Sequence, residues 1–331
     1  MLKTINVGVI GLGVGMIHAE TIYKNPTCKL VAVCDRDKKK LDLAKKKFRG
    51  IKFFENSDEI FKNKSIKMVI IASYDNFHAD HILKAIKNKK HFFVEKPFCL
   101  NFKEFKKINK TLQINKNIKF SSNLILRNSP HFHKIKKTLN LKYNNNIYYI
   151  EGEYNYGRIY KLLDWWGGKI PFYSVTLGGG IHILDLILNI VNDKVIKVNA
   201  VGNNLNTKKS RFKYNDCVTA IIVFKSGLHV KLLSNFSTVE NHNHYLKIFC
   251  KNINLQYNKN MTKTYTKNKV SLFNKKYSNK QKSLILNSFI NSLVKKNKKP
   301  LITQTQILNL MNISLFIEKS LETKKWQKII N

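Results

Sequence analysis

The chain has 331 residues, 43% of them hydrophobic, which is too long for one typical domain core and suits two domains. Its 60 lysines and arginines against 20 aspartates and glutamates give a formal net charge of +40, a balance that ordinarily indicates a nucleic acid or an acidic membrane surface as partner. The basic residues are spread along the whole chain, and only five of them are arginines. Arginine is the residue whose planar guanidinium recognises bases and phosphates. We therefore expect no nucleic-acid and no membrane partner.

The first third of the chain, up to about residue 122, alternates short apolar runs with helical patterns. Such alternation predicts parallel strands joined by crossover helices, and ligands of these sheets bind at the carboxyl ends of the strands. Helix starts precede two of the helical patterns, at Ser57 and at Asn101. We therefore place a Rossmann-type α/β domain at residues 1–122. Its apolar runs are Ile5 to Ile10, Leu30 to Cys34, Met68 to Ala72 and Phe92 to Val94.

A glycine turn follows the first apolar run, with Gly11, Gly13 and Gly15 at alternate positions. Gly11 allows the tight turn, and Gly13 lets the backbone approach a pyrophosphate closely. The helix that starts at Val14 supplies free amides and the positive end of its dipole. Met16 stands where the dinucleotide fingerprint has its third glycine, so Gly15 must permit the close helix packing, or the helix lies slightly further out.

A carboxylate ends the second apolar run. Asp35 lies at roughly the twenty-residue offset at which a carboxylate accepts the ribose hydroxyls of a dinucleotide. Its charge repels the extra phosphate of NADP, whereas Arg36 beside it would favour that phosphate. The pattern predicts NAD as the cofactor, with NADP as the alternative.

Polar residues also follow the third and fourth apolar runs. Ser73 ends one run and precedes Asp75 and His78, and Glu95 and Lys96 end the next. We expect Asp75 and His78 to shape the cofactor loop rather than to react. Lys96 could be one surface lysine among many, but its place between a buried strand and a proline favours a site where cofactor meets substrate.

The remaining two thirds of the chain contain longer, partly alternating apolar runs. These runs predict an antiparallel sheet, in which the turn Lys225 to Gly227 joins two strands as a hairpin. We place an α+β domain with a large, mainly antiparallel sheet at residues 123–331, with a loop or a weak strand pair at Asn258 to Asn279. The strand-like runs are Ile147 to Tyr154, Val195 to Val201, Val218 to Phe224, Leu228 to Phe236 and Tyr245 to Phe249, and the helical patterns are Ile181 to Val191, Leu284 to Val294 and Ile307 to Leu321.

The cysteines indicate a reducing compartment. The five cysteines are an odd number and show no CxxC spacing, as is typical of reduced core residues in a cytoplasmic protein. Lys3 followed by an apolar stretch could open a secretory signal, but the strand, glycine turn and helix pattern explains this segment better. We expect a cytoplasmic protein.

With these motifs in place, the chain resembles the Gfo/Idh/MocA family of nicotinamide-dependent oxidoreductases over nearly its whole length. That family acts on sugars, inositols and sugar nucleotides, and some members work in surface-polysaccharide pathways. The resemblance implies that the chain forms a homodimer or homotetramer through the open face of the second sheet. Its carriers are Val9 to Gly13 with His18 and Ala19, Ile71 to Ser73 with Asp75 and His78, Glu95 to Pro97, Asn123 with Arg127 and Pro130, and Gly178 to Gly180 with His182 and Asp185.

The resemblance implies that Lys96 and His182 flank the substrate carbon beside the nicotinamide. Oxidation of an alcohol needs a base for the hydroxyl proton while hydride leaves the same carbon, and imidazole suits that task near neutral pH. Lys96 would hold the oxygen and stabilise developing negative charge. His182 could instead be a core histidine, but the glycine run ahead of it would let a ligand approach.

Gly178 departs from the family's pattern, as Met16 does. It stands four residues before His182, where many members have an aspartate that assists the histidine, so the proton relay is in question. Asp185, one turn after His182, could support the imidazole or pack against the Rossmann domain. Gly178 therefore keeps a second interpretation open, a noncatalytic NAD-binding regulatory protein of the same fold.

Several other residues of the second domain are candidates for contact with the substrate, because aromatic faces pack on sugar rings.

Two histidine pairs, His131 with His133 and His242 with His244, suggest a metal site, but no carboxylate or thiol cluster accompanies them, and we expect no metal. The expected function is an NAD-dependent dehydrogenase acting on a secondary hydroxyl or ketone of a sugar, an inositol or a nucleotide sugar. The substrate candidates are Arg127, Tyr156, Arg158 and Trp165.

Overall fold

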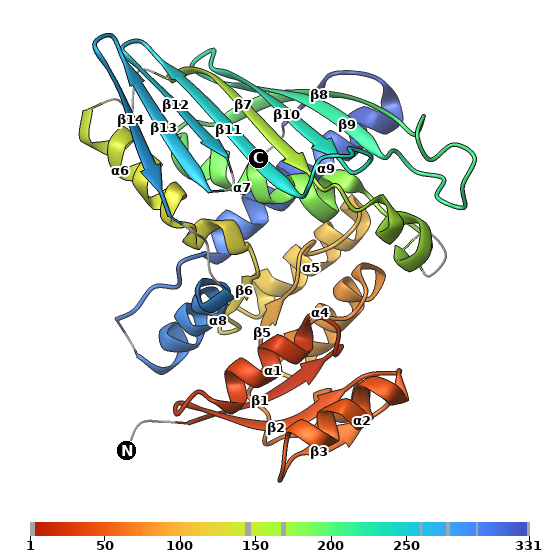
Figure 1. The fold of residues 1–331 in the computed structure, drawn as a ribbon. Coiled ribbons are helices and arrows are strands. Elements are labelled where there is room, and N and C mark those ends of the chain that lie inside the picture. The colour runs from red at the N-terminus through yellow and green to blue at the C-terminus, as the bar shows by residue number, and fades with distance from the viewer. Residues whose placement is uncertain are drawn as a thin grey trace. The chain divides into compact units, whose positions relative to one another are not determined.

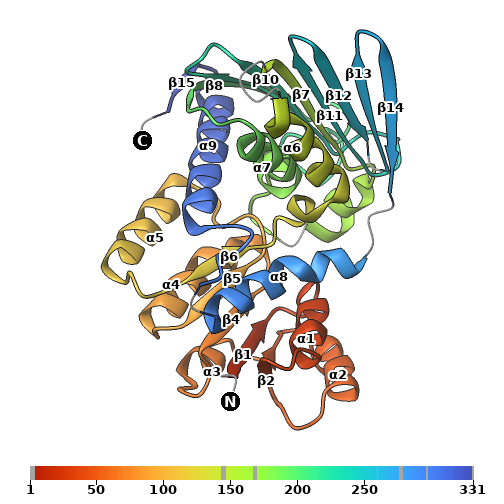
Figure 2. The same cartoon turned by 90° about the vertical axis from the view of Figure 1, so that its left-hand side faces the viewer.

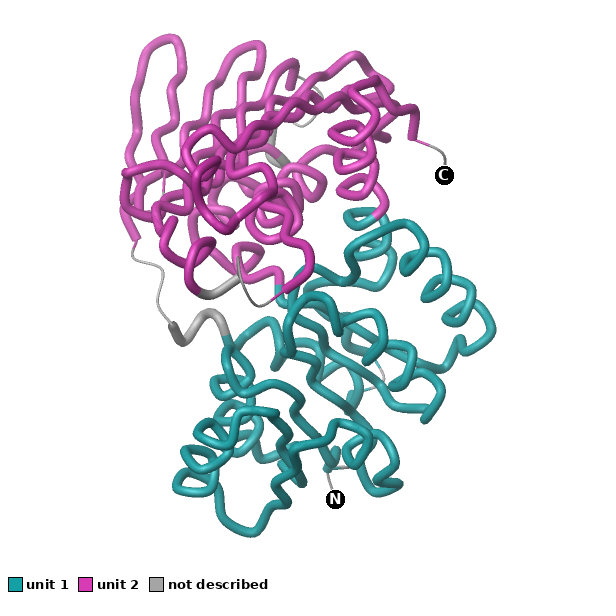
Figure 3. Tube along the Cα trace, turned by 90° about the vertical axis from the view of Figure 1, so that its right-hand side faces the viewer, with its two compact units in different colours: residues 1–123, 282–311 teal, residues 124–281, 312–331 magenta. Residues whose placement is uncertain are grey.

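The computed structural model describes residues 4–142, 147–166, 170–258, 260–275, 279–295 and 297–329 (Figure 1). The chain divides into two compact units, coloured separately in Figure 3. Unit 1 comprises residues 1–123 and 282–311, and unit 2 comprises residues 124–281 and 312–331. The division into functional domains at residues 1–122 and 123–331 stays a prediction.

Unit 1 is built on a parallel sheet of six strands in the order β3-β2-β1-β4-β5-β6. This order, with the first strand in the middle, confirms the predicted Rossmann fold. The central strands are buried on both faces, which explains why they read as continuous apolar runs in the sequence. The strands are β1 (Ile5–Ile10), β2 (Cys28–Cys34), β3 (Lys52–Phe54), β4 (Met68–Ile71), β5 (His91–Val94) and β6 (Phe120–Ser122).

Helices connect these strands, and two of them start where the sequence indicated. Helix α3 starts after Ser57, whose side chain makes no capping hydrogen bond, and α5 starts after Asn101. The side chain of Asn101 caps α5 by accepting a hydrogen bond from the amide of Glu104 at 2.9 Å, and the Glu104 carboxylate accepts from the amide of Leu100 at 2.8 Å. The start predicted at Asn101 is therefore confirmed. The helices are α1 (Gly15–Tyr23), α2 (Lys38–Lys47), α3 (Asp58–Lys62), α4 (His78–Lys87) and α5 (Phe102–Ile114), with a 3-10 turn η1 (Asp75–Phe77) before α4.

A helix from the end of the chain also belongs to unit 1. Most of α8 (Asn279–Val294) lies within the segment 282–311 of this unit. The ring of Phe289 packs 6.1 Å from that of Phe93 in β5, and Asn287 accepts a hydrogen bond from Asn25 at 2.9 Å. Contacts across more than 190 positions of the chain leave no signal in local periodicity, so the sequence could not assign this helix to the first unit.

Unit 2 contains a sheet of nine strands in the order β14-β13-β12-β11-β7-β10-β9-β8-β15. All neighbours pair antiparallel except β7 and β10, so the mainly antiparallel sheet is confirmed. The predicted hairpin joins β9 to β10, and Asn258 to Asn279 contains a strand pair. The strands are β7 (Ile147–Asn155), β8 (Val195–Asn203), β9 (Cys217–Phe224), β10 (His229–Asn235), β11 (Asn243–Cys250), β12 (Ile253–Asn258), β13 (Met261–Thr266), β14 (Lys269–Asn274) and β15 (Gln327–Lys328).

Helices cover one face of this sheet (Figure 2). Buried residues alternate with half-buried ones along β9, β10 and β11, as expected for a sheet with one covered face. Helix α7 packs directly on β7, because a Cβ at Gly152 would lie only 2.5 Å from Cγ2 of Ile183. No helix within the described residues combines the length and the apolar character that crossing a bilayer requires. The helical segments are α6 (Pro130–Lys142), α7 (Ile181–Ile190), the second half of α9 (Gln304–Thr323), η2 (Ile125–Asn128), η3 (Lys161–Trp166) and η4 (Thr176–Gly180).

Candidate functional site

The glycine turn lies between β1 and α1, as predicted. Gly11 has a φ of +86°, and a Cβ there would lie 2.3 Å from the carbonyl oxygen of Ala72, so only glycine fits. Gly15 is the first residue of α1, and a Cβ there would lie 3.1 Å from that of Ala72 and 3.3 Å from Cγ1 of Val9. Gly15 therefore provides the close helix packing that Met16 cannot provide, and the helix does not need to lie further out.

The turn also has the features that fit the pyrophosphate of a dinucleotide. A Cβ added at Gly13 would meet no other atom within 4 Å, so the backbone faces open space there. Among the described residues, the structure shows no hydrogen bond from the backbone amides of Gly13 and Val14. These amides stand at the start of α1, where the helix dipole favours an anion.

Asp35 lies beside this turn at the end of β2. Its Oδ2 accepts a hydrogen bond from the amide of Leu12 at 2.6 Å, and its Oδ1 accepts from the amide of Asp37 at 2.9 Å. The carboxylate of Asp35 is therefore in direct contact with the glycine turn, through the amide of Leu12. The guanidinium of Arg36 lies 4.7 Å from the centre of the Phe77 ring, so this cation packs on the turn after β4.

His78 joins the ends of two strands. Its Nδ1 lies 2.6 Å from the carbonyl oxygen of Pro97, and its Nε2 lies 3.0 Å from that of Ser73. The ring is fully buried, and its two nitrogens contact carbonyl oxygens of both loops, so His78 links the two loops. The hydroxyl of Ser73 contacts Nδ1 of His81 at 3.0 Å. That His78 shapes the cofactor loop rather than reacts stays a prediction.

Glu95 is the buried centre of the strand-end cluster. Its Oε1 accepts hydrogen bonds from Nε2 of His18 in α1 and from Nδ2 of Asn123 after β6, both at 2.7 Å. Burial by itself raises the pKa of Glu95, but these hydrogen bonds and the charges of His18 and Lys96 together lower the pKa below its ordinary value. His18 and Asn123 were only carriers of the family resemblance in the sequence, and their role as partners of Glu95 becomes visible in the structure.

Lys96 follows Glu95 and is half-buried. Its charge lowers the pKa of Glu95 and opposes the larger effect of burial, which raises the pKa of Asp75. The lysine therefore lies near two carboxylates at the carboxyl ends of β4 and β5. A position of this kind is unlike that of the many exposed lysines of the chain.

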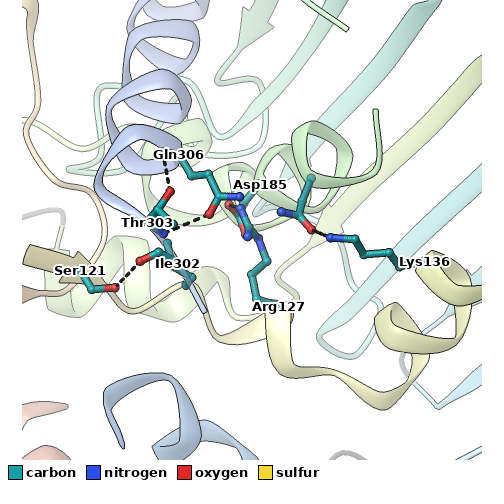
Figure 4. A network of polar contacts seen from close by, with 8 residues as sticks. Ser121, Arg127, Lys136, Asp185, Ile302, Thr303 and Gln306 are labelled. Carbon is teal, nitrogen blue, oxygen red and sulfur yellow. Dashed lines mark hydrogen bonds and ion pairs between the residues drawn. The ribbon is translucent and has the colours of Figure 1, made fainter. Parts of the chain in front are cut away.

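In unit 2, Arg127 and Asp185 form a buried ion pair (Figure 4). Nε of Arg127 donates to Oδ2 of Asp185 at 2.7 Å, and its NH2 donates to Oδ1 at 2.8 Å. Burial raises the pKa of Asp185, and the guanidinium opposes that shift. The contact that the structure shows for Asp185 is this bidentate pair, which ties α7 to η2, and its support of His182 stays a prediction.

His182 lies in α7 and is 5% exposed. Its ring stacks on Tyr154 of β7 with centroids 6.0 Å apart, and Tyr154 in turn stacks on Tyr156 at 6.1 Å. The rings of His242 and His244 lie 5.3 and 5.1 Å from that of Tyr154. The histidine therefore stands at one end of an aromatic row in unit 2.

The expectation that the glycine run before His182 leaves room for a ligand is wrong. Added Cβ atoms at Gly178, Gly179 and Gly180 would lie 2.2 Å from the hydroxyl of Tyr173, 2.5 Å from the ring of Tyr154 and 2.0 Å from the hydroxyl of Ser234. The chain's own side chains fill the space, so the glycines are needed for packing.

Two cations lie against the other end of the aromatic row. The guanidinium carbon of Arg158 is 5.4 Å and Nζ of Lys161 is 5.8 Å from the centre of the Tyr156 ring. Burial, followed by the charge of Arg158, lowers the pKa of Lys161. The structure thus brings the predicted Tyr156 and Arg158 together and adds Lys161, which the sequence did not single out. The side chain of Trp165 lies outside the described residues.

Glu318 of α9 is a further buried carboxyl that the sequence did not single out. Ser174 donates its hydroxyl proton to Oε1 of Glu318 at 2.7 Å and accepts from the amide of Leu177 at 3.0 Å. Burial raises the pKa of Glu318 to about 7, against the opposing hydrogen bond from Ser174. The pair fixes the segment that leads into the glycine run.

The described residues include no group of three histidines, cysteines, aspartates or glutamates that could hold a metal ion. The residues His131 and His133 do not act as a pair, because His131 is buried and contacts the hydroxyl of Thr262 at 2.9 Å, whereas His133 contacts Asn128 at 3.4 Å. The rings of His242 and His244 are close, at 4.7 Å, but they pack among aromatic rings.

Comparison with protein families matches both parts of the chain. A family described as "Oxidoreductase family, NAD-binding Rossmann fold" matches residues 5–123. A second, described as "GFO/IDH/MocA C-terminal domain", matches residues 132–256. Together the two matches cover more than half of the chain.

The chain is also similar to individual named proteins. Myo-inositol 2-dehydrogenase of Thermotoga maritima is 27% identical over 237 residues, which are 67% of this chain and 65% of that protein. The matches to two further inositol dehydrogenases span about a third or less of their length. The solved structure of scyllo-inositol dehydrogenase from Lactobacillus casei, with NAD(H) and scyllo-inositol, has a TM-score of 0.79 at 21% identity over 99% of both chains. UDP-N-acetylglucosamine 3-dehydrogenase from Acidithiobacillus ferrooxidans has a TM-score of 0.80 at 18% identity, over 97% of this chain and 98% of the other.

The raised pKa of Glu318 predicts a stability that falls as the pH rises. Because the folded state keeps a proton that the unfolded state releases, the stabilisation is complete below the ordinary pKa of 4.5 and is lost as the pH approaches 7. Glu318→Gln keeps an acceptor for Ser174 and removes the titration. We expect the variant to be more stable than the parent at pH 8 by about 3 kcal/mol and equal to it near pH 4, as measured by urea unfolding.

Glu59→Gln is the matched control for this prediction, because Glu59 is exposed in unit 1. It should leave the pH profile of unfolding unchanged. Parallel pH profiles for the parent and Glu318→Gln would show that Glu318 titrates normally.

Proposed function

The chain belongs to the Gfo/Idh/MocA family of oxidoreductases, and from this premise we propose that it is an NAD-dependent dehydrogenase of a sugar, an inositol or a nucleotide sugar. The observation that carries the proposal is the strand-end cluster of unit 1. There Glu95, held by His18 and Asn123, fixes the position of Lys96 on the same sheet edge as the glycine turn and Asp35. Relatives named as inositol dehydrogenases, and a structural neighbour named as UDP-N-acetylglucosamine 3-dehydrogenase, support inositols and nucleotide sugars as candidate substrates.

We assign the binding of the dinucleotide to unit 1. The amides of Gly13 and Val14, beside open space at Gly13, would hold the pyrophosphate, and the carboxylate of Asp35 would accept hydrogen bonds from the ribose hydroxyls. Arg36 packs on Phe77, Ser73 and His78 hold the loop after β4, and Asp75 starts η1 in that loop. When bound, the nicotinamide supplies the acceptor or donor of hydride.

We assign the proton chemistry to Lys96 and His182. The ammonium of Lys96 binds the substrate oxygen and stabilises the negative charge that develops on it as its proton leaves. The imidazole of His182 takes this proton when the alcohol is oxidised and returns it when the ketone is reduced. Arg158 and Lys161 beside Tyr156 offer positive charge to a phosphate or carboxylate on the substrate.

Lys96→Ala should abolish most of the turnover. We expect a loss in kcat of about 100-fold or more, because the variant leaves the developing oxyanion without its cation. The measurement is the nicotinamide absorbance change with NAD and a panel of inositols, free sugars and nucleotide sugars. Lys103→Ala, at an exposed position of α5, is the control and should keep full activity.

Two outcomes of that panel would overturn parts of the proposal. Full turnover in Lys96→Ala on a true substrate would remove Lys96 from the mechanism. NAD binding without turnover on any substrate would favour the second interpretation, a noncatalytic NAD-binding regulatory protein, which Gly178 keeps open.

Asp35→Asn should shift the cofactor preference toward NADP. The asparagine keeps an acceptor for the amide of Leu12, but it lacks the charge that repels the extra phosphate. We expect the ratio of the Kd for NADP to that for NAD to fall about tenfold or more, as measured by fluorescence titration. Asp42→Asn, on the exposed side of α2, should leave this ratio unchanged. An unchanged ratio in Asp35→Asn would show that another residue selects the cofactor.

We further propose a homodimer or homotetramer in the cytoplasm. The uncovered face of the nine-stranded sheet carries half-buried apolar and aromatic side chains such as Ile221, Leu233 and Tyr245, which suit an interface between copies of the chain. All five cysteines are free thiols, in agreement with a reducing compartment. Light scattering should give a molar mass that is a multiple of 38.6 kDa, the mass of one chain. Ile221→Lys, at the proposed interface, should lower the measured mass to that of a single chain. A monomeric parent would contradict the assembly, and recovery of the protein outside the cytoplasmic fraction of cells would contradict the location.

A further inference from the structure

Ser73 lies beside the glycine turn of unit 1. It follows β4 at the carboxyl edge of the parallel sheet, the edge at which ligands of such sheets bind. Its backbone lies against the turn, because a Cβ added at Gly11 would lie 2.6 Å from the amide nitrogen of Ser73. The serine is half-buried, so it borders the turn and keeps part of its surface accessible.

Two histidines from the start of α4 contact this serine. Nδ1 of His81 lies 3.0 Å from the hydroxyl of Ser73, and Nε2 of His78 lies 3.0 Å from its carbonyl oxygen. Residues three positions apart are neighbours on the surface of a helix, which explains why both rings reach the same residue. One histidine therefore holds the backbone of Ser73, and the other holds its side chain.

The ring of His81 has a fixed place. It stacks on Phe77 with centroids 6.1 Å apart, and it packs against Phe61 of α3 at 5.7 Å. His81 is 7% exposed, and burial lowers its pKa to about 4, so the imidazole is neutral at physiological pH. A neutral imidazole carries a proton on one nitrogen only, and a hydroxyl can complement Nδ1 as either donor or acceptor.

A serine hydroxyl without a partner rotates about its bond to Cβ. A hydrogen bond to a fixed ring removes this freedom before a ligand binds, so less entropy is lost on binding. His81 uses one of the hydrogen-bonding positions of the hydroxyl and leaves the others for a ligand. We propose that His81 is the positioning residue of Ser73 and directs its hydroxyl to the dinucleotide, a role that rests on the proposed binding of this cofactor by unit 1.

Two variants of His81 separate hydrogen bonding from packing. His81→Phe keeps a ring against Phe77 and Phe61 but removes the nitrogen, whereas His81→Asn loses the ring and keeps a polar atom near the place of Nδ1. We expect the Kd for NAD, measured by fluorescence titration without substrate, to rise about fivefold in His81→Phe and less than about twofold in His81→Asn. The reverse order would show that His81 only packs, and the proposal would be wrong.

A double-mutant cycle tests whether His81 acts through Ser73. Ser73→Ala removes the hydroxyl and should raise the Kd for NAD about as much as His81→Phe does. The combination of the two should raise it no further, because each substitution removes the same interaction. Effects that multiply in the double variant would show that the two residues act independently, which contradicts positioning.

His91→Phe is the matched control. His91 is the first residue of β5, at the opposite edge of the sheet from Ser73, and its Nδ1 accepts a hydrogen bond from the amide of Lys119 at 3.1 Å. The control also removes a histidine hydrogen bond from unit 1, but it should leave the Kd for NAD unchanged. A rise equal to that in His81→Phe would show that a loss of stability in unit 1 weakens cofactor binding, and would contradict the proposal.

The titrations separate this proposal from the proposed function, since they use NAD alone. The expected order of Kd values in a protein that oxidises no substrate would support the role of His81 and contradict the dehydrogenase. An unchanged Kd for NAD in His81→Phe, in a protein that does turn over a sugar or an inositol, would contradict the role of His81 and leave the dehydrogenase in place.

Discussion

The buried carboxylate of Glu95 is the interaction on which the functional part of unit 1 depends. A carboxylate buried without donors would take up a proton or destabilise the fold. Here His18 and Asn123 supply two hydrogen bonds to one oxygen, so three elements meet at a single atom. The glycine turn leads into α1, Lys96 follows Glu95, and β6 ends beside Asn123. The positions of the turn and of the lysine are therefore linked through one polar contact.

Unit 2 is organised by close packing around α7. Gly152 lets the helix approach β7, and the glycines 178–180 admit hydroxyls and rings from neighbouring elements. The ion pair of Arg127 and Asp185 then fixes the helix in a dry environment, where loss of either partner would leave a buried charge. His182 is thereby given a defined place beside Tyr154 before any ligand binds. This fixed place suits the role of base that we propose for His182, because a base that is oriented in advance needs less reorganisation during a reaction.

Much of the fold and part of the site could be predicted from the sequence. The alternation of apolar runs and helical patterns located the Rossmann strands, since central parallel strands are buried on both faces. The spacing of Gly11 and Asp35 predicted neighbours, and the structure brings Asp35 to the amide of Leu12. The glycine run was misread, because a sequence shows that a side chain is missing but not which group fills the space. Tyr173 and Ser234 fill it here.

The sequence by itself determined the two fold classes, the glycine turn and the residues at the strand ends. These follow from periodicity and short spacings, which local backbone geometry converts directly into structure. Only the tertiary structure decided that Glu95 binds His18 and Asn123, that Asp185 pairs with Arg127, and that α8 belongs to the first unit. Each of these contacts joins segments far apart in the chain, and their partners are selected by burial and by the need to satisfy polar groups, which no local pattern records.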